Sequence, residues 1–163
     1  PPMVARGVLF DMTKILGVEY LKAGQTFSVE DLKLAEKKQG IKVQRGDVVL
    51  FHTGWTDAML EKFPEKWGAE IPGLTPELAQ HLADLEVIAV GSDTYGLDVI
   101  PPVDPEEPFQ GHVILLQQNG IYILEAMNTG PLAKDGTFEF LFVLGQAKVR
   151  GAVQMYINPI AIK

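Results

Sequence analysis

A histidine and a glutamate bracket one apolar stretch of this chain, and together they could do chemistry. His112 opens the run H-V-I-L-L-Q-Q-N-G-I-Y-I-L-E and Glu125 closes it. A neutral imidazole and a carboxylate are ligands that borderline and hard divalent metal ions accept. They are also costly to place among valine, isoleucine and leucine side chains unless something pairs with them. The spacing is equally compatible with a structural ion pair, so this stretch supplies at most half of a metal site.

The other two histidines of the chain give weaker signals. His52 ends the apolar run 48–51, and strand ends in α/β folds often line clefts; it could equally be a histidine at the edge of the core that bonds to the backbone. His81 lies beside Gln80, away from the apolar side of its segment, and we expect it at the surface.

Two further segments could contribute to a substrate site. Asp93 and Thr94 directly follow the apolar run 87–90, where small polar residues can form a loop that faces a ligand. Alternatively, Asp93 bonds its own backbone and simply caps the strand. Trp55 and Trp67 flank a charged loop; they could line an apolar substrate pocket, or they could only support that loop.

Several catalytic classes lose support from the sequence. The chain has no cysteine, which excludes thiolate nucleophiles, disulfides and cysteine–zinc sites. It contains no G-x-S-x-G nucleophile motif, no Walker loop and no G-x-G-x-x-G motif. A metal-activated water remains as the hydrolytic option. Such a site needs three protein ligands and an open position, whereas this chain offers two good candidates.

Composition limits the partners and the setting. A chain of 163 residues that is 47% hydrophobic is expected to form one domain with a sizeable core. The net charge of −7 argues against a nucleic-acid partner, and the longest basic run, Lys37–Lys38, argues against a membrane surface. We see no transmembrane stretch and no signal peptide, and the lack of cysteine suits the cytoplasm.

The local patterns alternate between strands and helices and predict an α/β fold. Strands are expected at 3–10, 48–51, 87–90, 121–124, 138–144 and 152–157. Ser28 and Thr75 are expected to begin helices that run to Gly40 and Leu85, and a third helix is expected over 112–118. The proline-rich segment 101–108 is expected to be an irregular loop. Because the last third is rich in strands, we predict a mixed sheet or partial barrel with flanking helices.

Taken in order, these stretches resemble the cyclase family of metal-dependent hydrolases, which includes bacterial kynurenine formamidase and isatin hydrolase. The resemblance rests on segments 2–11, 45–50, 53–55, 72–74, 90–94 and 112–125, and it extends over essentially the whole chain. It implies a swivelling β/β/α-type α/β fold and hydrolysis of small amides, often N-formyl or cyclic ones. A divalent metal, zinc or manganese, is implied as cofactor, and a homodimer or homotetramer as assembly.

The resemblance also implies roles for particular residues. His112 and Glu125 correspond to metal-side residues, while Trp55, Asp93 and Thr94 are candidates for substrate binding. The family's upstream H-x-G-T-H-x-D-x-P-x-H motif, which supplies most ligands and a catalytic histidine, is absent from this sequence. We therefore expect residues 1–163 to be the C-terminal portion of such a hydrolase domain, with its catalytic histidine outside this chain. The alternative is a metal-free binding or structural module of the same fold.

Overall fold

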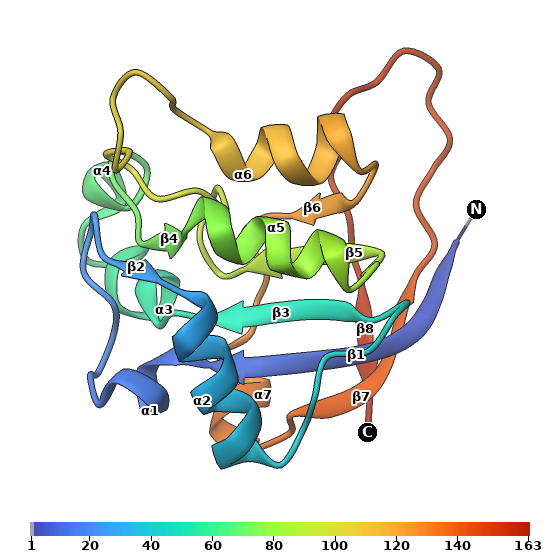
Figure 1. The fold of residues 1–163 in the computed structure, drawn as a ribbon, viewed down its shortest axis with the longest axis horizontal. Coiled ribbons are helices and arrows are strands. Elements are labelled where there is room, and N and C mark those ends of the chain that lie inside the picture. Colours follow the sequence, from blue (N-terminus) through green and yellow to red (C-terminus); the bar gives the residue numbers. More distant parts are fainter. Residues whose placement is uncertain (1) are drawn as a thin grey trace.

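The computed structural model describes residues 2–163, which form one α/β domain around a six-stranded mixed sheet (Figure 1). In the order β6-β5-β3-β1-β7-β8, the sheet comprises β6 (Tyr122–Leu124), β5 (Ala89–Ser92), β3 (Val48–His52), β1 (Met3–Asp11), β7 (Glu139–Leu144) and β8 (Ile160–Ile162). The first four of these strands are mutually parallel, whereas β7 and β8 join in antiparallel pairing. The predicted α/β class and mixed sheet are confirmed, with β6 and β8 as the sheet edges.

Helices connect these strands, and a small second sheet lies beside them. The helices are α1 (Met12–Leu16), α2 (Val29–Gln39), α3 (Trp55–Met59), α4 (Pro64–Trp67), α5 (Pro76–Asp84), α6 (Gln110–His112), the π-helix η1 (Val113–Gln118) and α7 (Gly130–Asp135). β2 (Thr26–Phe27) pairs in parallel with β4 (Gly73–Leu74). Within residues 2–163, no helix combines the length and the apolar character needed to cross a membrane.

The helix starts follow from capping chemistry. Ser28 begins α2 with a complete capping box, in which its hydroxyl accepts from the Asp31 N–H and the Asp31 carboxylate accepts from the Ser28 N–H. Thr75 caps α5, and Pro76 occupies its first turn. Both predicted starts are confirmed. The predicted helix over 112–118 is confirmed as helical, but most of it is a π-helix, which the apolar pattern does not distinguish from an α-helix.

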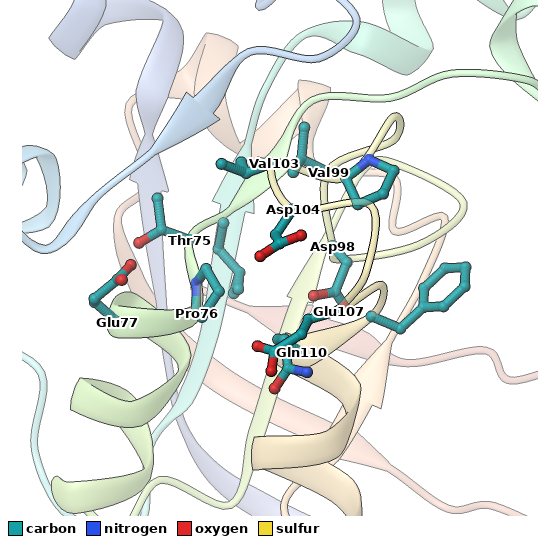
Figure 2. A pocket seen from close by; sticks show the side chains of 12 residues that line it. Thr75, Pro76, Glu77, Asp98, Val99, Val103, Asp104, Glu107 and Gln110 are labelled. Atoms are coloured by element: carbon teal, nitrogen blue, oxygen red, sulfur yellow. The ribbon is translucent and has the colours of Figure 1, made fainter.

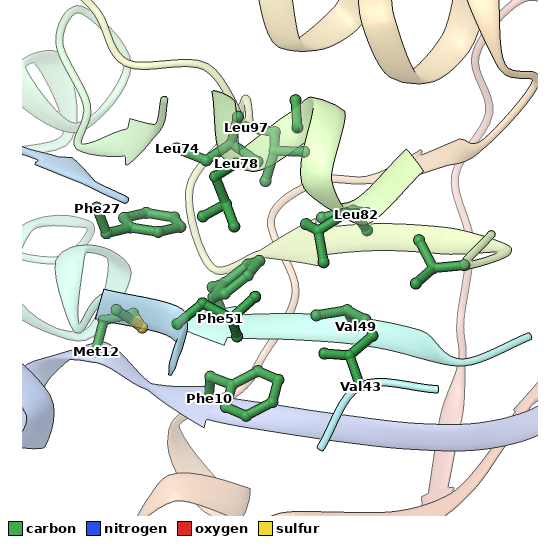
Figure 3. Close-up of a cluster of buried hydrophobic side chains, with 14 of the residues drawn as sticks. Phe10, Met12, Phe27, Val43, Val49, Phe51, Leu74, Leu78, Leu82 and Leu97 are labelled. Atoms are coloured by element: carbon green, nitrogen blue, oxygen red, sulfur yellow. The ribbon is translucent and has the colours of Figure 1, made fainter. Parts of the chain in front are cut away.

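Side chains of α2, α5 and η1 pack on one face of the sheet and form the larger core (Figures 1 and 3). Phe51 of β3 lies at its centre, with ring centroids 4.9 Å from Phe27 and 6.1 Å from Phe10. The opposite face carries a second cluster that includes Leu9, Leu50 and Phe142, against which α7 packs. The central parallel strands are therefore buried on both faces, which explains their almost continuous apolar sequences.

The predicted strand at 152–157 is wrong. The last strand is β8, and residues 145–159, which we call the arm, have no helix or strand between β7 and β8. Val153 is 98% exposed. Alternating apolar residues at 153, 155 and 157 resemble a strand pattern, but a strand also needs a neighbour, and the free edge of β7 pairs with residues 160–162 instead.

Candidate functional site

The four parallel strands each end at, or one residue before, a titratable side chain. Asp11 is the last residue of β1 and His52 is the last residue of β3, and these two residues are register partners. Asp93 directly follows β5, and Glu125 directly follows β6. Because parallel strands present their carboxyl ends at one edge, the sheet gathers all four there. Ligands of open α/β sheets bind at this edge.

His112 reaches this edge from the end of α6, and the structure brings it to Glu125. The His112 Nε2 atom lies 3.3 Å from Glu125 Oε1, so the predicted pair is in contact. Both side chains are about 30% exposed, 29% for His112 and 31% for Glu125. This partial exposure leaves the pair open to a ligand, in contrast to the buried carboxylates around it.

A third residue, Asp98, completes this group, and the sequence reasoning missed it. Its Oδ2 lies 2.5 Å from His112 Nδ1, so both ring nitrogens of His112 face carboxylates. Hydrogen bonding to Asp98 and then to Glu125 raises the pKa of His112 to about 9. The available signal was a single carboxylate inside the apolar run Leu97–Asp98–Val99–Ile100, because a buried carboxylate requires partners.

The backbone around His112 and Glu125 is irregular in three places. Phe109, which precedes α6, has φ 59°, and Ala126, next to Glu125, has φ 51°. The π-helix η1 starts directly after His112. Positive φ at non-glycine residues costs about 1–3 kcal/mol each, and such strain and π-helical turns concentrate at functional sites. The irregularity therefore favours a functional role for this pair.

Of the two predicted substrate-binding residues in this loop, Asp93 and Thr94, only Thr94 contacts the segment that follows Glu125, and it does so through its backbone. The Thr94 carbonyl oxygen accepts a 2.7 Å hydrogen bond from Ala126 N–H, which holds the turn that follows Glu125. The side chains of both residues face inward: the Thr94 hydroxyl bonds within its own loop, to the Gly96 carbonyl oxygen, and Asp93 is 2% exposed.

The Asp93 carboxylate serves the neighbouring loop. It accepts 2.7 Å hydrogen bonds from both the backbone N–H and the hydroxyl of Thr53. Burial raises the pKa of Asp93, and the opposing effects of His52 and of the Thr53 and Thr56 donors only reduce that rise. As placed here, Asp93 organises the start of α3.

Trp55 lies apart from His112 and Glu125. It is 3% exposed, packs with Met59 and Ile71, and donates its ring N–H to the Trp67 carbonyl oxygen at 3.3 Å. It lines neither of the two cavities described below. His52 is also buried, and its Nδ1 lies 2.8 Å from the Thr129 hydroxyl. His81 is half-buried on α5.

Two cavities flank the Asp98–His112–Glu125 group. The first, of about 320 Å³, is lined by Asp98 and by the carboxylates of Glu77, Asp104 and Glu107 (Figure 2). The second, of about 390 Å³, has Glu125 in its wall and is otherwise largely apolar; its lining includes Leu50, Met127, Phe140 and Phe142. The negative wall of the first cavity disfavours an anionic ligand, whereas the second suits an apolar group.

The residues fit a metal ion only as part of its coordination shell. Two ligands of a tetrahedral zinc ion, each about 2.0–2.2 Å from it, are separated by roughly 3.3–3.6 Å, and His112 Nε2 and Glu125 Oε1 are 3.3 Å apart. Within residues 2–163, however, no group of three or more candidate ligands could hold a metal. A complete site would need ligands from elsewhere.

Comparison with known proteins defines first the architecture and then the family. The structure superposes on a solved novel cyclase with TM-score 0.85 and 28% identity, covering 99% of this chain and 54% of that one. It also superposes on an isatin hydrolase bound to the product analogue thioisatinate (TM-score 0.78, 20% identity, 97% and 59% covered). A potential metal-dependent hydrolase with cyclase activity gives TM-score 0.66 at 19% identity, with 97% and 64% covered.

The sequence itself shows the family to which the chain belongs. The family model described as "Putative cyclase" matches residues 1–99, and the chain belongs to this family. No curated protein matches it. The chain spans between about half and two thirds of the length of the solved structures just described. The cyclase resemblance found in the sequence is therefore confirmed.

Proposed function

We propose that this chain forms part of a metal-dependent hydrolase that cleaves an N-formyl or cyclic amide. The observation that carries the proposal is the 3.3 Å separation of His112 Nε2 and Glu125 Oε1 at the carboxyl edge of the sheet. The naming of one structural neighbour as an isatin hydrolase and another as a potential metal-dependent hydrolase supports the same reaction class.

In this proposal, His112 and Glu125 supply two ligands of a zinc or manganese ion. When bound, the metal supplies Lewis-acid polarisation of the carbonyl group and a water molecule of lowered pKa. Glu125 also lines the apolar cavity, so a substrate bound in that cavity would lie next to Glu125 and His112. The Thr94 carbonyl oxygen holds the turn after Glu125, whereas Asp93 holds the loop that begins α3.

The remaining ligands and the proton-transferring histidine are proposed to come from polypeptide outside these 163 residues. Two observations support this: within the described residues no group of three candidate ligands could hold a metal, and the matched structures are considerably longer. The additional polypeptide could be part of the same gene product or a separate chain that binds here. In this view, residues 1–163 are the C-terminal portion of the hydrolase domain.

The substrate is proposed to be a small amide with an apolar ring. Phe140, Phe142 and Met127 line the cavity beside Glu125, and aromatic and sulfur-containing side chains favour an aromatic group. Trp55, which the sequence suggested as a pocket wall, would contribute only indirectly, since it is buried in another cluster.

The test is a hydrolysis screen of the complete natural protein, including any polypeptide beyond residues 1–163 or any chain that co-purifies with it. The protein is loaded in turn with Zn²⁺ and Mn²⁺. N-formyl arylamines, five-membered lactams and simple lactones are the substrates to compare. We expect turnover of an amide that is lost in His112→Gln and Glu125→Gln but kept in His81→Gln. Metal-loaded protein that hydrolyses none of these compounds would refute the proposal.

A second candidate is a metal-free binding or structural module, and one observation favours it. With Asp98 on one side and Glu125 on the other, His112 already has both ring nitrogens paired without a metal. The metal content of the purified gene product separates the two candidates. Stoichiometric zinc or manganese supports the hydrolase, whereas metal-free protein that takes up neither ion supports the module.

We also propose that the chain assembles as a homo-oligomer. The support is a set of exposed apolar side chains near the β8 edge of the sheet and on the arm; it comprises Val4, Leu141, Val149, Val153, Tyr156, Ile160 and Ile162. Exposed edge strands and apolar patches of this kind are commonly covered by other chains. Light scattering coupled to gel filtration would give the mass in solution, and a monomer at all concentrations would refute this.

A further inference from the structure

We propose that Asp98 is a positioning residue that orients the His112 ring and holds its proton on Nδ1, which leaves Nε2 directed at Glu125. The contact geometry alone carries this assignment. Its consequence for metal binding and hydrolysis rests on the proposed function.

The Asp98 carboxylate collects three donors from one short segment. Its Oδ1 accepts from Gly111 N–H at 2.6 Å, and its Oδ2 accepts from the backbone N–H of His112 at 3.0 Å. The same Oδ2 lies 2.5 Å from the His112 ring nitrogen Nδ1. An ionised carboxylate can only accept, so this contact requires a proton on Nδ1. The ring nitrogen that can serve another group is therefore Nε2.

Asp98 is itself held firmly in place. It is 6% exposed, and the Leu74 N–H donates to the adjacent Leu97 carbonyl oxygen at 3.1 Å. Gly73 permits this close packing, since a Cβ atom at that position would lie 2.2 Å from Val99 N. Because the backbone on both sides of Asp98 is fixed, its side chain loses little further conformational freedom when it binds His112. Asp98 can therefore fix the orientation of the His112 ring.

The side chain of Asp98 is equally confined from the His112 side. A Cβ atom at Gly111 would lie 2.6 Å from Asp98 Oδ1, closer than real Cβ contacts occur. The positive φ of Phe109 starts α6 so that the N–H groups of residues 111 and 112 both reach this carboxylate. The chain thus accepts a strained residue and a glycine at the point where Asp98 meets His112.

A purely structural helix cap would explain only part of this arrangement. Capping α6 requires the two backbone N–H contacts, but not the ring contact. In Asp98→Asn, one amide oxygen can still accept a backbone hydrogen bond. That same oxygen can also accept from Nδ1 when it occupies the Oδ2 position, so Asp98→Ala, which has no side-chain acceptor, is the variant that removes the ring contact. The Nδ1 signal, which a helix cap does not require, then separates the positioning role from the capping role.

The experiment is a long-range ¹H–¹⁵N correlation of the histidine rings in ¹⁵N-histidine-labelled chain at pH 10, above the pKa of about 9 for His112, where the ring carries a single proton. With three histidines in the sequence, His112→Gln assigns the relevant signals. We expect Nδ1 of His112 to give a protonated-type signal in wild type and an unprotonated-type signal in Asp98→Ala. The matched control is Asp104→Asn, which removes a charge from the same cavity wall (Figure 2) and should leave the signal unchanged.

Two outcomes overturn the inference: an unprotonated Nδ1 in the wild-type chain, or a protonated Nδ1 that persists in Asp98→Ala. The wild-type measurement decides even if Asp98→Ala fails to fold. As a second variant, Gly111→Ala should weaken the protonated-type signal by displacing the carboxylate. Failure of the proposed function looks different, because a protonated Nδ1 together with no hydrolysis in the substrate screen would leave the positioning role intact and remove only the hydrolase.

Discussion

Asp98 and His112 are 14 residues apart, yet the Oδ2 atom of the first lies 2.5 Å from the Nδ1 atom of the second. The proline-rich segment between them leaves the sheet edge and returns as α6. Asp98 lines the acidic cavity and Glu125 lines the apolar one, and His112 contacts both carboxylates. His112 is therefore the central residue of a three-residue group, and each experiment on it must consider both carboxylates.

The stability of the chain should depend on pH through His112. Hydrogen bonds from the ring to Asp98 and then Glu125 raise its pKa from 6.5 to about 9 in the folded state. Because the folded-state pKa is higher than the unfolded one, the protonated ring stabilises the folded chain. This stabilisation is complete below pH 6.5 and is lost as the pH rises through about 9. Urea midpoints measured between pH 6 and pH 10 should fall across this window in wild type. In His112→Gln the fall should be clearly smaller, and parallel curves for the two proteins would contradict the prediction.

Glu125→Gln should weaken metal binding without unfolding the gene product. The amide is a poorer metal ligand than the carboxylate, while its size is nearly the same. Removing a residue that only supports a metal ligand typically lowers metal affinity by about 10–100-fold. Since Glu125 is proposed as a ligand itself, we expect a loss of affinity for Zn²⁺ or Mn²⁺ of about that size or more. Competition with a chromophoric chelator measures it. Glu107→Gln, which lies in the other cavity wall, serves as the control and should bind as wild type does.

Substitutions at Asp93 should separate its charge from its hydrogen bonds. Asp93→Ala leaves the buried N–H and hydroxyl of Thr53 without their acceptor, which costs about 1–3 kcal/mol per unsatisfied group. Asp93→Asn keeps an acceptor oxygen and removes a buried charge, so its cost should be much smaller. Chemical denaturation of both variants tests this. Equal destabilisation by alanine and asparagine would show that the acceptor is not the important feature.

Truncation of Phe51 should open a cavity in the larger core. The ring is fully buried between Phe10 and Phe27 (Figure 3). Phe51→Ala should therefore lower the free energy of unfolding by about 3–5 kcal/mol. Leu34→Ala is the matched control, because Leu34 is 41% exposed on α2 and should change stability by about 0.5 kcal/mol or less. A small effect at Phe51 would mean that the core relaxes into the space.

The sequence determined the elements whose information is local. Apolar runs fixed the central strands, and Ser28, Thr75 and Pro76 fixed two helix starts, because capping and periodicity act over a few residues. The pairing of His112 with Glu125 was also predictable, since one helical segment and one strand join them. The family resemblance came from the same short segments taken in order.

The tertiary structure decided what depends on contacts between distant segments. Asp98 became a partner of His112 only because the irregular loop folds back, and no local pattern encodes that return. The alignment of Asp11, His52, Asp93 and Glu125 at one edge depends on parallel pairing between strands far apart in sequence. The strand predicted at 152–157 failed for the same reason: alternation shows that a segment can form a strand, but the neighbour that completes its hydrogen bonds is chosen by the whole fold.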